Sequence, residues 1–75
     1  MWILTEDKTR IFDTSSSDTF YLLNEGNTSA CAVMYHHPDG SHIRLGVYKT
    51  KLMATTAIEH IFKSLEAGRN AHAMY

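Results

Sequence analysis

The apolar positions of this chain follow two different spacings, and the change comes near residue 50. Before it, short runs of β-branched and aromatic residues lie between turn-forming segments, which is typical of β-strands. After it, apolar residues recur at steps of three and four, the period of an amphipathic helix. We therefore predict an α+β fold, with a sheet of about five antiparallel strands and one C-terminal helix packed on one face.

The strand pattern occurs in five segments of the first part of the chain. They are, in order, residues 2–4, 10–12, 19–24, 28–37 and 41–48. Turns are expected at "EDK", 6–8, and at "EGN", 25–27, with a polar connection at "TSSSD", 14–18. Because the first turn has no glycine, the sequence leaves the register of the N-terminal hairpin open.

The helical pattern predicts one helix over residues 50–67. Thr50 can cap its first turn, and Gly68 suits the position just after its last turn. The apolar stripe consists of Ala54, Ala57, Ile58, Ile61, Phe62 and Leu65. The segment 69–75, "RNAHAMY", has no clear period and is predicted to be a tail. The 75 residues thus form a single small domain, with the sheet in 1–48, the helix in 50–67 and the tail in 69–75.

The stretch "YHHPDGSHI", residues 35–43, predicts the tip of a β-hairpin. Proline, aspartate and glycine suit a three-residue loop at 38–40 with glycine in the left-handed conformation. The cross-strand pairs expected from this loop are His37–Ser41, His36–His42, Tyr35–Ile43, Met34–Arg44, Val33–Leu45 and Cys31–Val47.

Alternation along these two strands sorts their side chains onto two faces. The face expected to meet the helix carries Cys31, Val33, Tyr35, Ile43, Leu45 and Val47. The opposite face carries Ala30, Ala32, Met34, His36, His42, Arg44, Gly46 and Tyr48.

The histidines of the hairpin raise the question of a metal or catalytic site. Two facing histidines supply only part of the three or four ligands that zinc requires, so we expect no metal. A metal-independent nuclease or toxin using four side chains of one face is the enzymatic alternative. Those side chains are His36, His42, Arg44 and Tyr48. The sequence has no recognisable catalytic or cofactor-binding motif, and we predict a protein that is not an enzyme and has no cofactor.

The composition indicates the cellular location and the class of partner. The formal charge of −1 and the scattered basic residues argue against a dedicated nucleic-acid binder. A single cysteine, Cys31, fits a reducing compartment, and no apolar stretch approaches the length of a membrane helix. "MWILTEDK" turns acidic too early for a signal peptide. These features predict a cytoplasmic location and a partner that is neither a membrane nor a nucleic acid.

Four side chains make the predicted contact patch for a protein partner. Met34, Arg44 and Tyr48 share the face away from the helix, and Met53 lies in the first helical turn. Tyrosine and arginine often anchor interfaces, and methionine adapts to a partner's shape. The competing interpretation is that the N-terminal hairpin, with Trp2 and Phe12, covers this face.

The segment "LGVYKTKLMATTAIEHIF", together with the opening "MWIL", resembles small uncharacterised proteins of Gram-positive bacteria and their phages. The resemblance implies a β-sheet followed by a C-terminal helix, and it implies no activity. We expect a non-enzymatic protein-binding module, such as a phage or mobile-element inhibitor of a host or defence enzyme, a class that includes anti-CRISPR proteins. The alternatives are the small nuclease or toxin described above and a homodimeric structural protein that self-associates through the open sheet face or edge.

Overall fold

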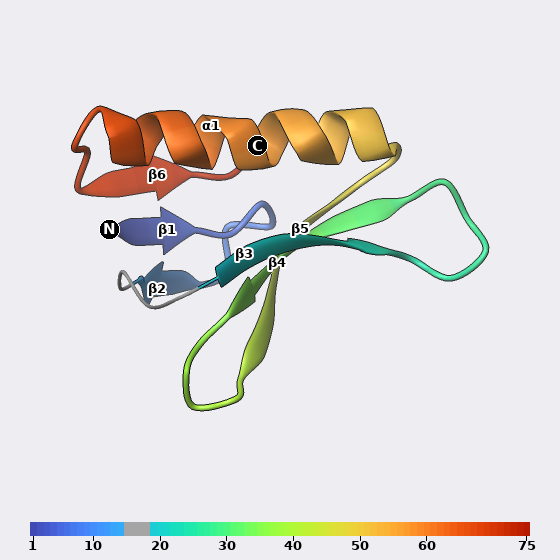
Figure 1. Cartoon of the computed structure of the whole chain (residues 1–75), viewed down its shortest axis with the longest axis horizontal. Coiled ribbons are helices and arrows are strands. Elements are labelled where there is room, and N and C mark those ends of the chain that lie inside the picture. Colours follow the sequence, from blue (N-terminus) through green and yellow to red (C-terminus); the bar gives the residue numbers. More distant parts are fainter. Residues whose placement is uncertain (15–18) are drawn as a thin grey trace.

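A computed structural model describes residues 1–14 and 19–75, in which it shows six strands and one helix (Figure 1). They are β1 (Trp2–Leu4), β2 (Ile11–Asp13), β3 (Thr19–Asn24), β4 (Cys31–His36), β5 (His42–Tyr48), α1 (Lys51–Glu66) and β6 (Ala71–Ala73). Residues 15–18 of the predicted polar connection lie outside the described part of the chain. The α+β class is confirmed. The strands form two small sheets, however, and not one antiparallel sheet of about five strands.

Sheet A has the strand order β2-β1-β6. β1 and β2 are antiparallel, with Ile3 opposite Phe12. Their turn is made without glycine, because Lys8 takes a positive φ of 61° and the Asp7 carboxylate accepts hydrogen bonds from Thr5 and Thr9. These local hydrogen bonds stabilise the turn without a glycine, so the sequence lacked the residue that would have indicated the register.

The predicted C-terminal tail is wrong, because residues 71–73 form β6, parallel to β1. The Trp2 N–H donates to the Asn70 carbonyl at 2.8 Å, and the Met74 N–H donates to the Leu4 carbonyl at 2.9 Å. The Met74 side chain is 1% exposed and belongs to the hydrophobic core. A three-residue strand has no period of its own, and β1, far away in sequence, supplies its pairing.

Sheet B has the strand order β3-β4-β5, and the β4–β5 hairpin has the predicted tip. The His37 N–H donates to the Ser41 carbonyl at 3.0 Å, and Gly40 has a φ of 97°. The pairs nearest the loop are confirmed, namely His36–His42, Tyr35–Ile43 and Met34–Arg44.

Beyond Met34 the predicted register is wrong, because a β-bulge shifts the pairing by one residue. Val33 faces Gly46 in place of Leu45, and Cys31 faces Tyr48 in place of Val47. A one-residue shift exchanges the faces of all the side chains that follow it. Val47 therefore points outward, at 39% exposed, and Tyr48 enters the core, at 7% exposed.

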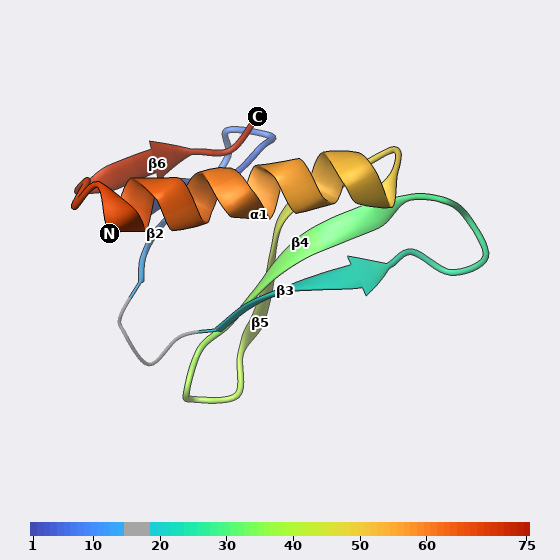
Figure 2. The same ribbon diagram turned by 45° about the horizontal axis from the view of Figure 1, so that its top comes forward.

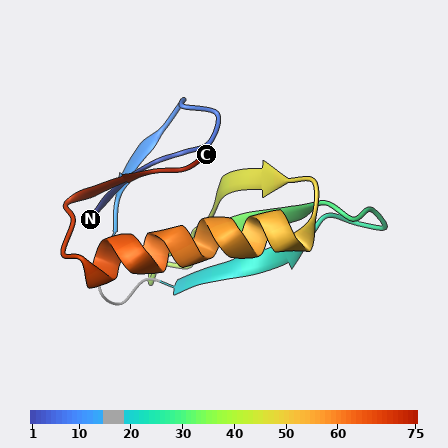
Figure 3. The ribbon, with the colours of Figure 1, turned by 90° about the horizontal axis from the view of Figure 1, so that it is seen from above.

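The helix α1 packs on sheet B, and sheet A lies beside it, with β6 running back along the helix (Figures 2 and 3). Thr50 caps the helix as predicted, its hydroxyl accepting from the Met53 N–H at 3.2 Å, and Gly68 follows its end with a φ of 70°. Ile61 is buried in the same core cluster as Val33 and Leu45, as expected from the apolar stripe. Phe62 and Leu65 of the same stripe are 63% and 48% exposed.

The turn of the β1–β2 hairpin joins the two sheets. The Glu6 N–H donates to the Leu45 carbonyl at 2.8 Å, and the Glu6 carboxylate accepts from the Val47 N–H at 3.1 Å. Both bonds go to β5, an outer strand of sheet B. Ile3 of β1 and Phe12 of β2 pack into the shared core, so the N-terminal hairpin does not cover the opposite face of sheet B with Phe12.

Candidate functional site

The four residues of the predicted contact patch do not form one surface. Met34 lies opposite Arg44 as predicted, but Met34 is only 7% exposed, and the exposed Arg44 guanidinium lies 3.0 Å from the Glu25 carboxylate. The bulge places Tyr48 on the other face, in the core. Met53 is 48% exposed and lines a hollow together with Tyr48. The structure thus brings together Met34 with Arg44, and Tyr48 with Met53.

The hairpin histidines are cross-strand neighbours, as predicted. The His36 and His42 rings stack with centroids 4.4 Å apart and planes 11° apart. The Tyr21 hydroxyl is hydrogen-bonded to His42 Nδ1 at 2.7 Å, and the Tyr35 hydroxyl to His37 Nδ1 at 3.2 Å. The described residues contain no group of three or more metal-binding side chains. Because Tyr48 lies on the opposite face, the four side chains of the nuclease alternative are not assembled.

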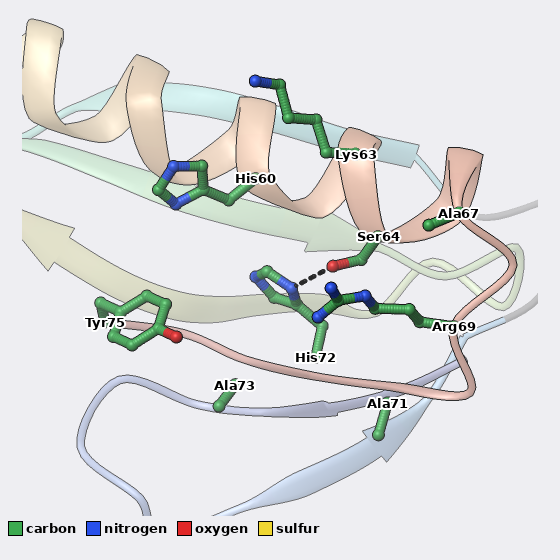
Figure 4. A pocket seen from close by; sticks show the side chains of 9 residues that line it. All are labelled: His60, Lys63, Ser64, Ala67, Arg69, Ala71, His72, Ala73 and Tyr75. Atoms are coloured by element: carbon green, nitrogen blue, oxygen red, sulfur yellow. Dashed lines mark hydrogen bonds between the residues drawn. The ribbon is translucent and has the colours of Figure 1, made fainter.

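A groove between α1 and β6, the helix–β6 groove, is lined at one end mainly by polar side chains (Figure 4). Its first part, the cationic end, is a hollow of about 310 Å³. The polar side chains that line this end are His60, Lys63, Ser64, Arg69, His72 and Tyr75. His60, Lys63 and Ser64 come from one side of α1, since they are spaced by three and four residues. None of the described residues lining this end is acidic.

His72 is the central side chain of the cationic end. It projects from the middle of β6 toward the helix, where Ser64 Oγ and His72 Nδ1 are hydrogen-bonded at 2.7 Å (Figure 4). Its other ring nitrogen, Nε2, points away from Ser64, toward the side where His60 and Tyr75 lie (Figure 4). Burial, and then the positive charges of His60 and Arg69, lower the pKa of His72 below its usual value of 6.5.

The Ser64–His72 pair has the spacing of a nucleophile and its general base. Ser64 is only 5% exposed, however, and none of the described groove residues places a carboxylate at this end to orient the imidazole. The hydrogen bond satisfies a buried hydroxyl, which is the ordinary role of such a pair in a protein interior. The hydrogen bond therefore fixes the orientation of the His72 imidazole at the side of the groove. The pair does not by itself assemble a catalytic relay.

The second part of the groove, the apolar end, is a hollow of about 330 Å³. Tyr48, Met53, Ala57 and Met74 line it together with Glu6 and Thr56, and His60, His72 and Tyr75 belong to both ends. The Tyr48 hydroxyl is buried here without a hydrogen-bond partner among the described residues. Burial, with a smaller effect of the Glu6 carboxylate, raises the pKa of Tyr48 to about 12, so the hydroxyl keeps its proton.

A separate apolar groove, the β3–α1 groove, runs between the outer strand of sheet B and the helix. It has a volume of about 340 Å³ and is lined by Thr19, Phe20, Ile58, Ile61, Phe62 and Leu65. β3 is an outer strand of the described sheet, so the side of β3 away from β4 has no paired strand there. Exposed aromatic and leucine side chains beside an unpaired strand edge are unusual on a free surface.

The outer face of sheet A is a third apolar area. Trp2 is 52% and Ile11 63% exposed, and they line a shallow hollow with Leu4, Ala71 and Ala73. Small or apolar side chains of all three strands make up this face, and its central strand, β1, is paired on both sides.

The sequence did not predict either groove. One depends on a strand, and the other on exposed apolar side chains, that the hydrophobic pattern does not indicate. The helix–β6 groove requires β6, whose only signal is the alternation Ala71, His72, Ala73, Met74. His60 and Ser64 could have been noted as polar side chains one turn apart beside the apolar stripe. The β3–α1 groove requires Phe62 and Leu65 to remain exposed, although they fit the stripe.

Comparisons with known proteins return no match to a family model, to a curated protein or to a solved structure. The resemblance drawn from the sequence therefore stays an expectation. In the described residues, no helix is both long enough and apolar enough to cross a membrane.

Proposed function

We propose that this chain is a non-enzymatic protein-binding module that holds an extended segment of a partner protein in the β3–α1 groove. The observation that carries the proposal is the apolar groove itself, which is lined by Thr19 and Phe20 at the start of β3, an outer strand of the described sheet. An extended peptide that adds to a sheet edge gains main-chain hydrogen bonds from the strand, and pockets for its alternate side chains give specificity.

The lining of the groove suits such a peptide. Phe20 and Ile58 are partly buried, while Phe62 and Leu65 keep much of their area exposed. A partner side chain placed between them would remove apolar area from water on both molecules, which is the main source of binding free energy. Alternate apolar residues of the partner segment fit this arrangement.

Charge beside the groove indicates which segments should bind best. Glu59 and Glu66 lie three residues before and four residues after Phe62, and both are exposed. Residues at these spacings are neighbours on a helix surface. A lysine or arginine in the partner segment would meet these carboxylates, so we expect a segment with alternating apolar residues and at least one basic residue.

An inhibitor of a host or defence enzyme, the role expected from the sequence, is one use of such a module. An inhibitor that occupies its target by strand addition needs no catalytic residue. The proposed contacts therefore differ from the patch predicted from the sequence. Met34 has little exposed area, and the Arg44 guanidinium is already paired with the Glu25 carboxylate.

The test is a selection of displayed random peptides on the full chain, followed by binding measurements with the selected peptides. We expect enriched peptides with alternating apolar residues and a basic residue. Phe62→Ala should weaken their binding by more than about 1 kcal/mol, since exposed aromatic anchors carry much of an interface's free energy. Trp2→Ala, on the outer face of sheet A, and Arg44→Ala, beside Met34 on sheet B, should leave it unchanged. Amides of β3 should exchange more slowly in the complex.

Several results would contradict the proposal. No enrichment over background, or peptides that bind Phe62→Ala as well as the parent chain, would remove the groove as the site. Loss of binding in Trp2→Ala alone would move the site to the outer face of sheet A. Protection of β3 that depends on protein concentration without any peptide would favour a homodimer that pairs two β3 edges.

A further inference from the structure

The helix–β6 groove is separate from the β3–α1 groove and has a different chemistry. Its two hollows, of about 310 and about 330 Å³, meet at His60, His72 and Tyr75. Sites for small ligands have volumes of roughly 300–1,000 Å³, with mostly apolar walls and a few polar groups that fix the orientation. The basic side chains lie mainly at one end and the apolar side chains at the other, where Glu6 is the acidic residue among the described lining.

The cationic end offers donors and positive charge to an anion. Lys63 and Arg69 carry fixed charges there, and His60 adds an imidazole on the helix side. Arg69 extends back along the groove toward His72 (Figure 4). A guanidinium presents a planar fork of N–H donors that matches a phosphate bidentately, and a lysine adds a mobile point charge. No side chain among the described residues that line this end is acidic, and the carboxylates of Glu59 and Glu66, four residues before and three after Lys63, lie outside the lining.

The Ser64–His72 hydrogen bond fixes the direction of a further donor. If the Ser64 hydroxyl donates to Nδ1, the neutral imidazole carries its proton on Nε2, which points toward the open part of the groove (Figure 4). If His72 is protonated, both ring nitrogens donate, and Nε2 still presents an N–H in that direction. In either state His72 can donate a hydrogen bond to an oxygen held between His60 and Tyr75.

The apolar end supplies a place for the body of the ligand. Met53, which is 48% exposed, and the buried Met74 form flexible walls that adapt to a flat or irregular group. The buried Tyr48 hydroxyl lacks a partner among the described residues, and a buried polar group of this kind is costly unless it is paired. A ligand that carries a polar atom on its body would satisfy that hydroxyl.

We propose that the helix–β6 groove binds a small phosphate monoester, with the phosphate at Arg69, Lys63 and His72 and an aromatic or apolar body against Met53 and Tyr48. The proposal is independent of peptide binding at β3, because the two grooves lie on different sides of α1 and use different residues. A phosphate monoester fits better than a single carboxylate, since the Arg69 guanidinium lies beside His72, and Lys63, whose ammonium points away from them in Figure 4, is a flexible side chain that can turn toward a bound anion.

The probe is phenyl phosphate, followed by NMR titration of the full chain, with inorganic phosphate and phenol as comparison ligands. We expect saturable shifts of the His72 imidazole signals and tighter binding of phenyl phosphate than of either fragment by at least ~10-fold. Arg69→Gln should weaken binding of both phosphate-containing probes by ~10-fold or more. Met53→Ala should weaken phenyl phosphate and leave inorganic phosphate unchanged.

Lys49→Gln is the matched control, because Lys49 is an exposed cation outside the lining of the groove. It should bind phenyl phosphate as the parent chain does. Equal losses in Arg69→Gln and Lys49→Gln would show unspecific attraction to the positive charges and would overturn the proposal. Phenyl phosphate no tighter than inorganic phosphate, or no saturable shift at His72, would overturn it as well. None of these results bears on the peptide selection with Phe62→Ala.

Discussion

Gly46 shows how one residue without a side chain decides the position of another. A Cβ at Gly46 would lie 3.0 Å from the Glu6 Cβ and 3.1 Å from the Tyr48 hydroxyl oxygen, both too close for ordinary contact. The absence of that Cβ lets the Tyr48 ring fold over Gly46 and lets the β1–β2 turn approach β5. Tyr48 thereby becomes a wall of the helix–β6 groove instead of an anchor on the opposite face.

His72 should couple the stability of the fold to pH. Burial, followed by the charges of His60 and Arg69, lowers its pKa in the folded chain below 6.5, while the unfolded chain lacks these influences. The unfolded chain therefore binds a proton at a pH where the folded chain does not. The His72 contribution to stability is full above pH 6.5 and is lost as the pH falls through the lower folded pKa.

The measurement is urea unfolding of the parent chain and of His72→Gln at about pH 7.5 and about pH 5.5. The other groups at this end, Lys63, Ser64 and Tyr75, are present in both proteins. We expect the loss of unfolding free energy between the two pH values to be smaller in His72→Gln, because glutamine does not titrate. The same loss in both proteins would show that His72 does not link folding to protons.

At the scale of elements, the local chemistry of a turn was predictable and long-range pairing was not. Pro38, Asp39 and Gly40 define their loop through their own conformational preferences, so the three pairs next to it follow from the sequence. The bulge further along has a local signal in Gly46, because a glycine inside a strand often marks a bulge or a close approach of backbone. β6 has no comparable signal, since it depends on the free edge of β1.

The candidate sites follow the same division. The pairing of Met34 with Arg44 depended only on the hairpin and was predicted correctly. The helix–β6 groove depends on β6 and on the rotation that the bulge gives to Tyr48, and both are decided by contacts between distant segments. Helical spacing places Ile61 and Phe62 in one stripe, yet Ile61 is 1% and Phe62 63% exposed, because the packing of α1 on sheet B covers only part of that stripe.

That distinction between buried and exposed stripe positions can be measured on α1. Ile61 is 1% exposed in the core, and Ile61→Ala should lower the free energy of unfolding by about 2–5 kcal/mol through lost burial and a cavity. Leu65→Ala, at a position 48% exposed, should cost about 1 kcal/mol or less. If Ile61→Ala does not fold, Ile61→Val should still show a loss of about 0.5–1.5 kcal/mol. Equal effects at the two positions would show that the helix faces the sheet differently.

At the scale of the whole molecule, the two ends of the chain pair with each other and share the hydrophobic core. β1 lies between β2 and β6, so sheet A exists in its full width only when the C-terminal segment is paired. Ile3 of β1 and Met74, next to β6, belong to one core cluster with Leu45 and Ile61. A chain of this length buries only about 60% of its unfolded surface, so each large core side chain supplies an appreciable part of the stability.

Met74 is therefore expected to be a structural residue, although it lies in a segment whose sequence predicts a tail. Its side chain is 1% exposed and its N–H donates to the Leu4 carbonyl, so Met74→Ala should lower the free energy of unfolding by about 2–5 kcal/mol. Tyr75→Ala, at the neighbouring position that is 79% exposed, is the control and should change stability by about 0.5 kcal/mol or less.

Chemical unfolding of both variants measures the difference, and hydrogen exchange of the β1 amides reports on the pairing directly. Because the Trp2 N–H donates to the Asn70 carbonyl, that amide should exchange faster in Met74→Ala if the segment loosens as a unit. A Met74→Ala variant as stable as Tyr75→Ala, with the Trp2 amide equally protected, would show that sheet A holds without this end of the chain.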